Sequence, residues 1–259
     1  MSEGLSIDEE QNVDVIINGE VVSGKFLAKS PKFDIALISI KKKDITEDTK
    51  KNIVPIKLGN SNKSTLGSFV ISYGESGDES GIFNYGIISK KSNQSMVDAN
   101  VTVINTNIAT SSNDDGLLFD SNGNLLGIGT DMGPDSDTFK VVGIYDIKRH
   151  IEKLSADIDV VLFGIYGEDI TENIASRYDI PNGVYLTDVA FDSPAYKAGL
   201  KSGDIITAID GSEIKSMDDI ENILSDYKTG KTMSVDIKRK NKDGYFDMSF
   251  DVNIVKYKA

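Results

Sequence analysis

The chain has 259 residues, a formal net charge of −13 and a pI of about 4.6. This acidity argues against binding nucleic acid or an anionic membrane face, because both need clustered Lys and Arg. The absence of Cys excludes disulfides and thiolate metal sites. The longest apolar run, residues 160–163, is far shorter than the roughly 20 residues of a transmembrane helix.

The first 145 residues are dominated by predicted short strands. Residues 13–17 and 21–28 flank Asn18-Gly19, which is the strongest short signal for a β-hairpin. Residues 35–40 form an apolar run typical of a strand that is buried on both faces. Further short strands are predicted at residues 53–57, 66–74, 86–89, 101–104, 116–119, 125–128 and 140–143. Many short strands joined by Gly-, Asn- and Ser-rich turns predict a barrel or a sandwich.

The pattern changes after residue 145. Apolar residues at helical spacing predict a helix over residues 146–154, and residues 155–157 indicate a linker. Ser193 before Pro194 predicts an N-cap and the first turn of a short helix. Ser216 and Asp219 have the spacing of a capping box at the start of another helix. Alternating apolar residues at 233–237 and 246–254 predict a hairpin with one buried face.

Four short motifs in the last third occur in the order and spacing of one known domain. They are Ser193-Pro194-Ala195, Ala198-Gly199-Leu200, Gly203-Asp204-Ile205-Ile206 and Ile209-Asp210-Gly211. On these motifs, residues of about 160–255 resemble a PDZ domain of the bacterial HtrA type. The resemblance places the family's carboxylate-binding loop at Leu162-Phe163-Gly164-Ile165.

The chemistry of such a loop agrees with peptide binding. Consecutive backbone N–H groups around a Gly form a concavity that can hold a terminal carboxylate, and the next strand offers an edge to an extended peptide. The helix that carries Ile220 and Leu224 would form the opposite wall and accept an apolar C-terminal side chain. The alternative is that Phe163 and Ile165 are core residues only and that no ligand binds.

Residues 13–145 resemble the trypsin-like domain of HtrA-type serine proteases, from partway through its first barrel. The motifs that carry this resemblance are residues 34–38, 58–76, 86–89 and 104–128. The first of them begins with Asp34, which the resemblance assigns to the position of the triad Asp. An ungapped alignment over the last motif assigns Asp114 to the position of the nucleophilic Ser.

The catalytic pattern of that family is broken in this chain. No His precedes Asp34, and the single His of the chain, His150, follows the nucleophile position. A Ser hydroxyl attacks only when a base removes its proton, and both groups are missing here. The carboxylates of Asp114 and Asp115 would also repel the negative charge that an oxyanion hole must stabilise. The sequence therefore predicts a pseudoprotease.

We therefore expect a mainly β chain with a trypsin-like double β-barrel, its first barrel incomplete, followed by a PDZ domain. The expected domains are residues 1–145 and 158–259, joined by a helical linker at 146–157. The expected function is binding of C-termini or unfolded peptides as a scaffold, sensor or quality-control factor, with no cofactor and no metal.

The resemblance implies a bacterial, extracytoplasmic location, with an anchor or export signal upstream of this chain. An open first barrel predicts homo-oligomer contacts near residues 13–40.

Three alternatives stay open at this point. The chain could be an active serine endopeptidase whose His lies in a missing N-terminal segment, or one that uses Ser111 or Ser112. The carboxylates of Asp34, Asp114 and Asp115 could share a proton or bind Ca²⁺, rather than being solvated loop acids. The protease-like part could also be an architectural spacer only.

Overall fold

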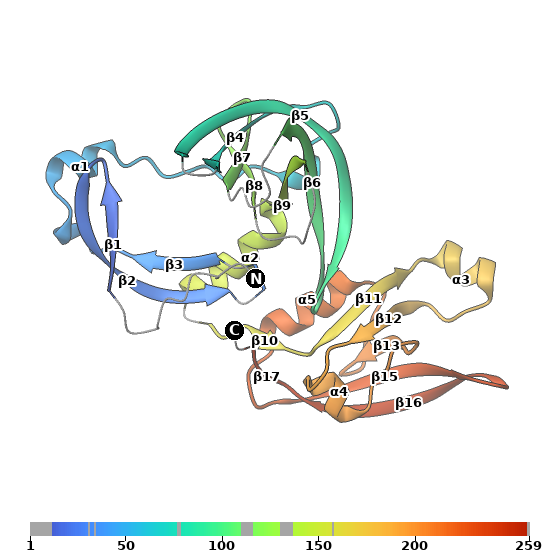
Figure 1. The fold of residues 1–259 in the computed structure, drawn as a ribbon. Coiled ribbons are helices and arrows are strands. Elements are labelled where there is room, and N and C mark those ends of the chain that lie inside the picture. Colours follow the sequence, from blue (N-terminus) through green and yellow to red (C-terminus); the bar gives the residue numbers. More distant parts are fainter. Residues whose placement is uncertain are drawn as a thin grey trace. The chain divides into compact units, whose positions relative to one another are not determined.

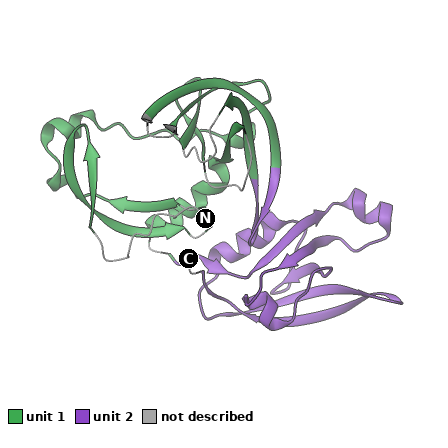
Figure 2. Ribbon diagram, in the orientation of Figure 1, with its two compact units in different colours: residues 1–92, 102–158, 259 green, residues 93–101, 159–258 purple. Residues whose placement is uncertain are grey.

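A computed structural model describes residues 12–30, 32–33, 35–76, 79–109, 116–129, 137–156 and 158–257. The chain divides into two compact units, which Figure 2 shows in different colours. Unit 1 comprises residues 1–92 and 102–158, and unit 2 comprises residues 93–101 and 159–258. Residues 93–101 are the tip of a hairpin whose two strands lie mainly in unit 1. This hairpin therefore contributes to both units.

Unit 1 begins with an antiparallel sheet of three strands in the order β1-β2-β3 (Figure 1). The strands are β1 (Asn12–Ile17), β2 (Glu20–Ser30) and β3 (Ile35–Ser39). Asn18 and Gly19 form the predicted hairpin turn, with φ values of 50° and 82° that suit Asn and Gly. Over the described residues this sheet does not close on itself, and the incompleteness of the first barrel stays a prediction.

The second part of unit 1 is a closed barrel in the order β4-β5-β6-β9-β8-β7. Its strands are β4 (Phe69–Ser76), β5 (Glu79–Met96), β6 (Ala99–Ala109), β7 (Gly116–Asp120), β8 (Leu125–Ile128) and β9 (Thr138–Gly143). Inward-facing apolar side chains such as Val70, Ile104 and Val141 fill it and are fully buried. Along β6, buried residues largely alternate with less buried ones, as expected where one face of a strand points into a barrel.

Short helices connect these strands. They are η1 (Lys42–Asp44), α1 (Glu47–Asn52), η2 (Ser61–Lys63) and α2 (Ile144–Ser155). Helix α2 covers the helix predicted over residues 146–154 and packs against β2, β3, β8 and β9 of unit 1. In the described part of the chain no helix is long and apolar enough to cross a membrane.

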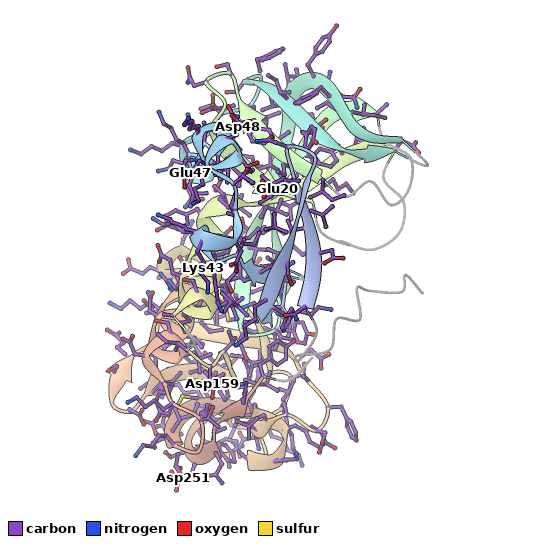
Figure 3. All side chains as sticks on the ribbon, turned by 90° about the vertical axis from the view of Figure 1, so that its left-hand side faces the viewer. Glu20, Lys43, Glu47, Asp48, Asp159 and Asp251 are labelled. Atoms are coloured by element: carbon purple, nitrogen blue, oxygen red, sulfur yellow. The ribbon has the colours of Figure 1, made fainter. Side chains whose placement is uncertain are left out.

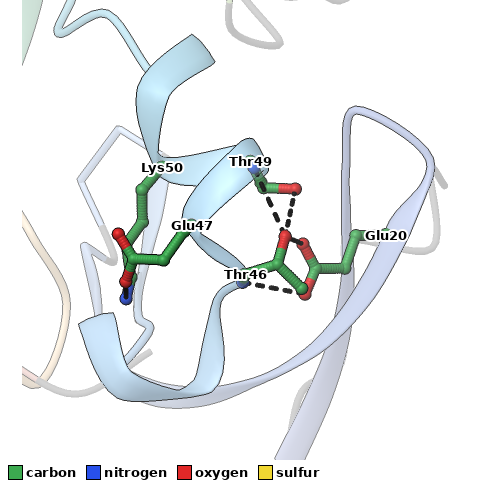
Figure 4. A network of polar contacts seen from close by, with 5 residues as sticks. All are labelled: Glu20, Thr46, Glu47, Thr49 and Lys50. Carbon is green, nitrogen blue, oxygen red and sulfur yellow. Dashed lines mark hydrogen bonds and ion pairs between the residues drawn. The ribbon is translucent and has the colours of Figure 1, made fainter.

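A polar network fastens the start of β2 to helix α1 (Figure 4). Glu20 accepts hydrogen bonds from the backbone N–H of Thr46 at 3.1 Å and from its hydroxyl at 2.8 Å. Thr46 is the N-cap of α1 and accepts from the N–H of Thr49. Hydrogen bonds, chiefly those with Thr49 and Thr46, hold the pKa of Glu20 below its usual range. Around this network, Lys43, Glu47 and Asp48 project from the surface (Figure 3).

Unit 2 is built on one larger sheet whose main path is β11-β12-β13-β15-β16. The strands are β10 (Val161–Leu162), β11 (Ile165–Ile170), β12 (Gly183–Val189), β13 (Ile205–Ile209), β14 (Ser212–Glu213), β15 (Thr232–Asn241), β16 (Gly244–Asn253) and β17 (Val255–Lys256). The helices are α3 (Glu172–Tyr178), α4 (Pro194–Ala198) and α5 (Met217–Asp226). Strand β14 pairs with β13, and β10 pairs with β17 in a separate two-stranded sheet.

Helix α5 and the sheet share the main apolar core of unit 2. The predicted N-caps are present at Ser193 and Ser216, and Ser216 forms a capping box with Asp219. One ion pair lies at the edge of this core. The carboxylate of Asp204 is only 1% exposed and accepts two hydrogen bonds from the guanidinium of Arg239, at 2.6 and 2.7 Å. Breaking such a pair by removing one partner leaves a buried charge without compensation.

Three predicted segments differ from the structure. Residues 53–57, expected as a strand, have no regular structure, because Pro55 lacks the N–H that a ladder requires. Strands β5 and β6 extend well beyond the predicted segments 86–89 and 101–104. The polar run of residues 90–95 indicates a loop by composition, yet it continues β5 to a two-residue turn at Val97 and Asp98.

The chain's single His is a buried residue of unit 1. His150 lies on α2, and its ring contacts the edge of Phe33 with ring centroids 4.8 Å apart. Its Nδ1 has no hydrogen-bond partner among the described residues. Burial, followed by the charges of Lys32, Lys153 and Arg149, lowers the pKa of His150 to about 3.

This pKa predicts loss of stability in acid. Below pH 6.5 the unfolded chain binds a proton at His150 that the folded chain rejects until about pH 3, so stability is full above pH 6.5 and falls as the pH falls. Between pH 7.5 and pH 5 the wild type should lose about 2 kcal/mol more unfolding free energy than His150→Leu. Urea unfolding of both proteins at both pH values measures this difference, and equal losses would contradict it.

Candidate peptide-binding site

The two positions assigned to a catalytic triad lie outside the described residues. Asp34 falls between the described residue Phe33 and β3, and Asp114 falls between the end of β6 at Ala109 and the start of β7 at Gly116. Ser111, Ser112 and Asp115 belong to the same segment. The roles predicted for these residues therefore stay predictions.

Asp120, at the end of β7, resembles the start of a calcium loop in sequence only. Its carboxylate accepts hydrogen bonds from the backbone N–H groups of Asn122 and Asn124, at 2.8 and 2.9 Å, and from the side chain of Asn124. These bonds close the turn between β7 and β8. Among the residues that the structure describes, no group of three or more His, Cys, Asp or Glu side chains could hold a metal ion.

The predicted carboxylate loop, Leu162 to Ile165, lies in unit 2 and joins β10 to β11. Gly164 has a φ of 95°, a conformation that favours Gly. The carbonyls of the loop are held from one side: Ala195 N–H donates to Phe163 O at 2.9 Å, and Ala190 N–H donates to Gly164 O at 2.9 Å. With the carbonyls fixed in this way, the N–H groups of successive residues point to the other side.

Three successive backbone N–H groups converge on one carboxylate, and we call them the amide nest. Phe163 N–H donates to Asp98 Oδ2 at 2.8 Å, while Gly164 N–H and Ile165 N–H donate to Asp98 Oδ1 at 2.7 and 2.9 Å. Asp98 is only 6% exposed. Its charge, acting after burial, contributes to raising the pKa of Tyr257. The loop is therefore built to hold a carboxylate group.

The strand that follows the amide nest also has a usable edge. Strand β11 stands at one end of the main sheet path, so one side of it has no partner strand within that path. On this side, Asp98 N–H donates to Ile165 O at 2.8 Å, and Asn100 Nδ2 donates to Gly167 O at 3.2 Å. The edge can thus accept hydrogen-bond donors from an added chain segment.

The apolar wall predicted for the site forms a single cluster. Phe163, Ile165, Ile220 and Leu224 all belong to the main core of unit 2 and are buried. Helix α5, which carries Ile220 and Leu224, contacts β11 and is fastened to it by Met217 N–H, which donates to Asp169 Oδ1 at 2.7 Å. Leu162 is half-buried. The structure thus brings the predicted residues together, and their contact with a ligand stays a prediction.

Sequence reasoning missed Asp98 and Asn100 entirely. Both come from the tip of the β5–β6 hairpin, which belongs to unit 2 although most of the hairpin belongs to unit 1 (Figure 2). Asp98 has a φ of 58°, which Asp tolerates better than most residues. No local signal indicated this role, because the bonded residues are 65 to 67 positions apart in the chain.

Two protein families match this chain. Residues 2–128 match the trypsin-like peptidase domain, and residues 147–249 match the PDZ domain. The two matches follow one another in the order that the sequence predicted.

Named relatives match across both regions. The "Serine protease Do-like HtrA" of Lactobacillus helveticus is 26% identical over 250 residues, covering 88% of this chain and 59% of that protein. A "Probable periplasmic serine endoprotease DegP-like" of Chlamydia muridarum is 28% identical over 235 residues, covering 87% of this chain and 46% of that protein. The chain thus spans about half the length of these curated relatives.

Solved structures share the fold. "HtrA-type protease AlgW with decapeptide" superposes with a TM-score of 0.59 at 18% identity, covering 93% of this chain and 74% of that one. The serine endoprotease from Yersinia pestis gives a TM-score of 0.60 at 19% identity, covering 98% of this chain and 84% of that one. The expected combination of a trypsin-like fold with a PDZ domain is thereby confirmed.

The geometry of the loop predicts a strong effect of a methyl group at Gly164. A Cβ there would lie 2.1 Å from Ser193 Cβ, whereas a Cβ at Gly203, whose φ is also positive, would meet nothing within 4 Å. Gly203→Ala should cost about 1 kcal/mol of unfolding free energy from backbone strain, and Gly164→Ala about 3 kcal/mol because the clash adds to it. Denaturant unfolding measures both.

Ser193→Gly provides the control for this clash. It removes the side-chain atoms that a Cβ at Gly164 would strike, and it should itself cost about 1 kcal/mol, because the N-cap and the hydrogen bond from Ser193 Oγ to Gly164 O are both lost. In the double variant we therefore expect at least about 1 kcal/mol of recovery relative to additivity. Strictly additive losses would show that the close packing of Gly164 on Ser193 is wrong.

Proposed function

We propose that this chain, which belongs to the HtrA-type proteins with a trypsin-like peptidase domain followed by a PDZ domain, binds peptide C-termini without cleaving them. The observation that carries this proposal is the amide nest, in which Phe163, Gly164 and Ile165 direct three N–H groups at one carboxylate. A C-terminal carboxylate offers the same two oxygen acceptors as an Asp side chain.

The rest of the site would serve an extended peptide. Its backbone would add to the edge of β11, where Ile165 and Gly167 already accept hydrogen bonds. Its last side chain would lie against the apolar cluster formed by Phe163, Ile165, Ile220 and Leu224. Such a site recognises the terminal carboxylate and an apolar last side chain, and it tolerates many sequences before that residue. This selectivity suits the binding of partly unfolded proteins, which expose many different C-terminal sequences.

The chemistry of the protease-like part supports binding without cleavage. The resemblance assigns Asp114 to the nucleophile position, and the only His of the chain is His150. This His is buried against Phe33. The Nδ1 of this imidazole has no hydrogen-bond partner among the described residues, so no hydroxyl is bonded to that atom as a nucleophile would be to its base. Asp34 would then be a triad acid without a His to orient.

The family and the binding site together support a proposed cellular role. Several relatives are named periplasmic, which supports a location outside the cytoplasm and a role as scaffold, sensor or quality-control factor. Self-association is also part of the proposal. Strands β1 and β3 each leave one edge without a partner strand among the described residues, and such edges favour pairing between copies.

A second candidate function is serine endopeptidase activity. The names of the relatives favour it, since they are called serine proteases, although this chain spans about half of their length. Activity would need a base supplied from elsewhere and a Ser, such as Ser111 or Ser112, in reach of it.

Peptide binding by the full chain tests the first candidate. Fluorescein-labelled decapeptides ending in valine, leucine, isoleucine or phenylalanine are made in matched pairs, with a free C-terminal carboxylate or with a C-terminal amide. Fluorescence anisotropy should show binding of the free acids, and amidation should weaken it by about tenfold or more, because a charge-assisted acceptor is lost. Equal binding of acid and amide would show that the amide nest does not read the carboxylate.

Labelling with a fluorophosphonate separates the two candidates. This reagent reacts with activated Ser, so we expect no adduct that is specific to the native protein. Denatured protein serves as the background control, trypsin as the positive control, and peptide mass mapping locates any adduct. A native-specific adduct on Ser111 or Ser112 would replace the binding proposal with the endopeptidase.

A further inference from the structure

The amide nest already holds a carboxylate that belongs to the chain itself. The Asp98 carboxylate accepts hydrogen bonds from all three N–H groups of the nest. The backbone N–H of Asp98 donates to the carbonyl of Ile165. The side-chain Nδ2 of Asn100 donates to the carbonyl of Gly167, two residues further along β11. The hairpin tip, residues 93–101, therefore uses both the carboxylate site and the strand edge that an incoming peptide would need.

These contacts exclude a second ligand. Each N–H group of the nest is a single donor already engaged at 2.7 to 2.9 Å, which leaves no free donor for another carboxylate. The Ile165 carbonyl is likewise engaged by Asp98 N–H at 2.8 Å. A C-terminal peptide can enter only when Asp98 leaves.

The docked hairpin tip also carries features that make its release feasible. Asp98 has a φ of 58°, a conformation that L side chains adopt at a cost in free energy. The Oδ1 atom of Asn100 is buried and has no hydrogen-bond partner among the described residues. When the tip is released, water can donate a hydrogen bond to this oxygen. Release therefore supplies a hydrogen bond that the Asn100 side chain lacks in the docked state.

From this geometry we infer that Asp98 is an internal ligand of the carboxylate site and competes with external C-terminal carboxylates for the amide nest. The inference rests on the proposed peptide binding and adds its regulation. In the docked state the site is closed by the chain's own β5–β6 hairpin. Removing the Asp98 carboxylate opens the site, and the affinity for peptides rises by the reciprocal of the fraction of time that the site was open.

Two substitutions remove the carboxylate and preserve the turn. Asp98→Asn keeps the shape but replaces one acceptor oxygen with an amide donor, and Asp98→Gly removes the side chain; both residues tolerate a positive φ. Asp251→Asn is the matched control, because it makes the same change of charge at an exposed residue of unit 2 (Figure 3).

The experiment measures two quantities on the full chain and on these variants. The first is the affinity for the acid and amide decapeptides, and the second is the hydrogen-exchange rate of the amides at 163–165 without peptide. We expect both Asp98 variants to bind acid peptides about tenfold more tightly than the wild type, as for a site closed nine-tenths of the time. Their nest amides should exchange faster and regain protection when peptide is added. Asp251→Asn should match the wild type in both.

The other outcomes separate the two proposals. If the wild type and both Asp98 variants bind acid peptides equally and still reject amides, the proposed function stands and competition by Asp98 is wrong. If no variant binds any peptide while the nest amides exchange faster, the proposed function fails, and the competition fails with it. Unchanged exchange in both Asp98 variants would show that Asp98 does not occupy the nest. Lower thermal stability of the variants without a gain in affinity would assign Asp98 a purely structural role.

Discussion

The burial of one carboxylate against three backbone N–H groups is the interaction around which unit 2 is arranged. A buried carboxylate without partners would be prohibitively unfavourable, because it loses its hydration. Asp98 replaces that hydration with hydrogen bonds from Phe163, Gly164 and Ile165, all between 2.7 and 2.9 Å. The loop is equally dependent on the acid, since buried N–H groups also need acceptors. Each side therefore stabilises the other.

The surrounding packing explains why the N–H groups stay aligned. Carbonyls of the loop accept from Ala190 and Ala195, at the end of β12 and the start of α4, so the peptide planes cannot rotate freely. The positive φ of Gly164 turns the chain between them, and Ser193 fills the space beside it. Beneath the loop, Phe163 and Ile165 anchor it in the core. The site is thus preorganised by a fixed backbone and not by mobile side chains.

The sequence predicted those parts of the molecule that depend on local pattern. Strand alternation, the Asn18-Gly19 turn and the caps at Ser193 and Ser216 each depend on residues that are close together in the sequence. The carboxylate loop was placed by the family resemblance instead. The predicted strand ended at residue 89, because the polar residues 90–95 carry no local strand signal and the pairing that extends β5 comes from its neighbour. The occupant of the site was beyond prediction. Asp98 meets Gly164 only through the folded path of a long hairpin, and no spacing rule relates them.

The chain connection between Asp98 and the site has a quantitative consequence. A ligand that is tethered near its site acts at a high effective concentration, on the order of millimolar for short flexible connections. Free peptides compete with this local concentration, so the peptide concentration at half occupancy is higher than it would be for the open site. Occupancy still rises gradually with the abundance of exposed C-termini, over a range set by the internal ligand. A weak internal ligand of this kind would set the sensitivity of the domain without altering which C-termini it prefers.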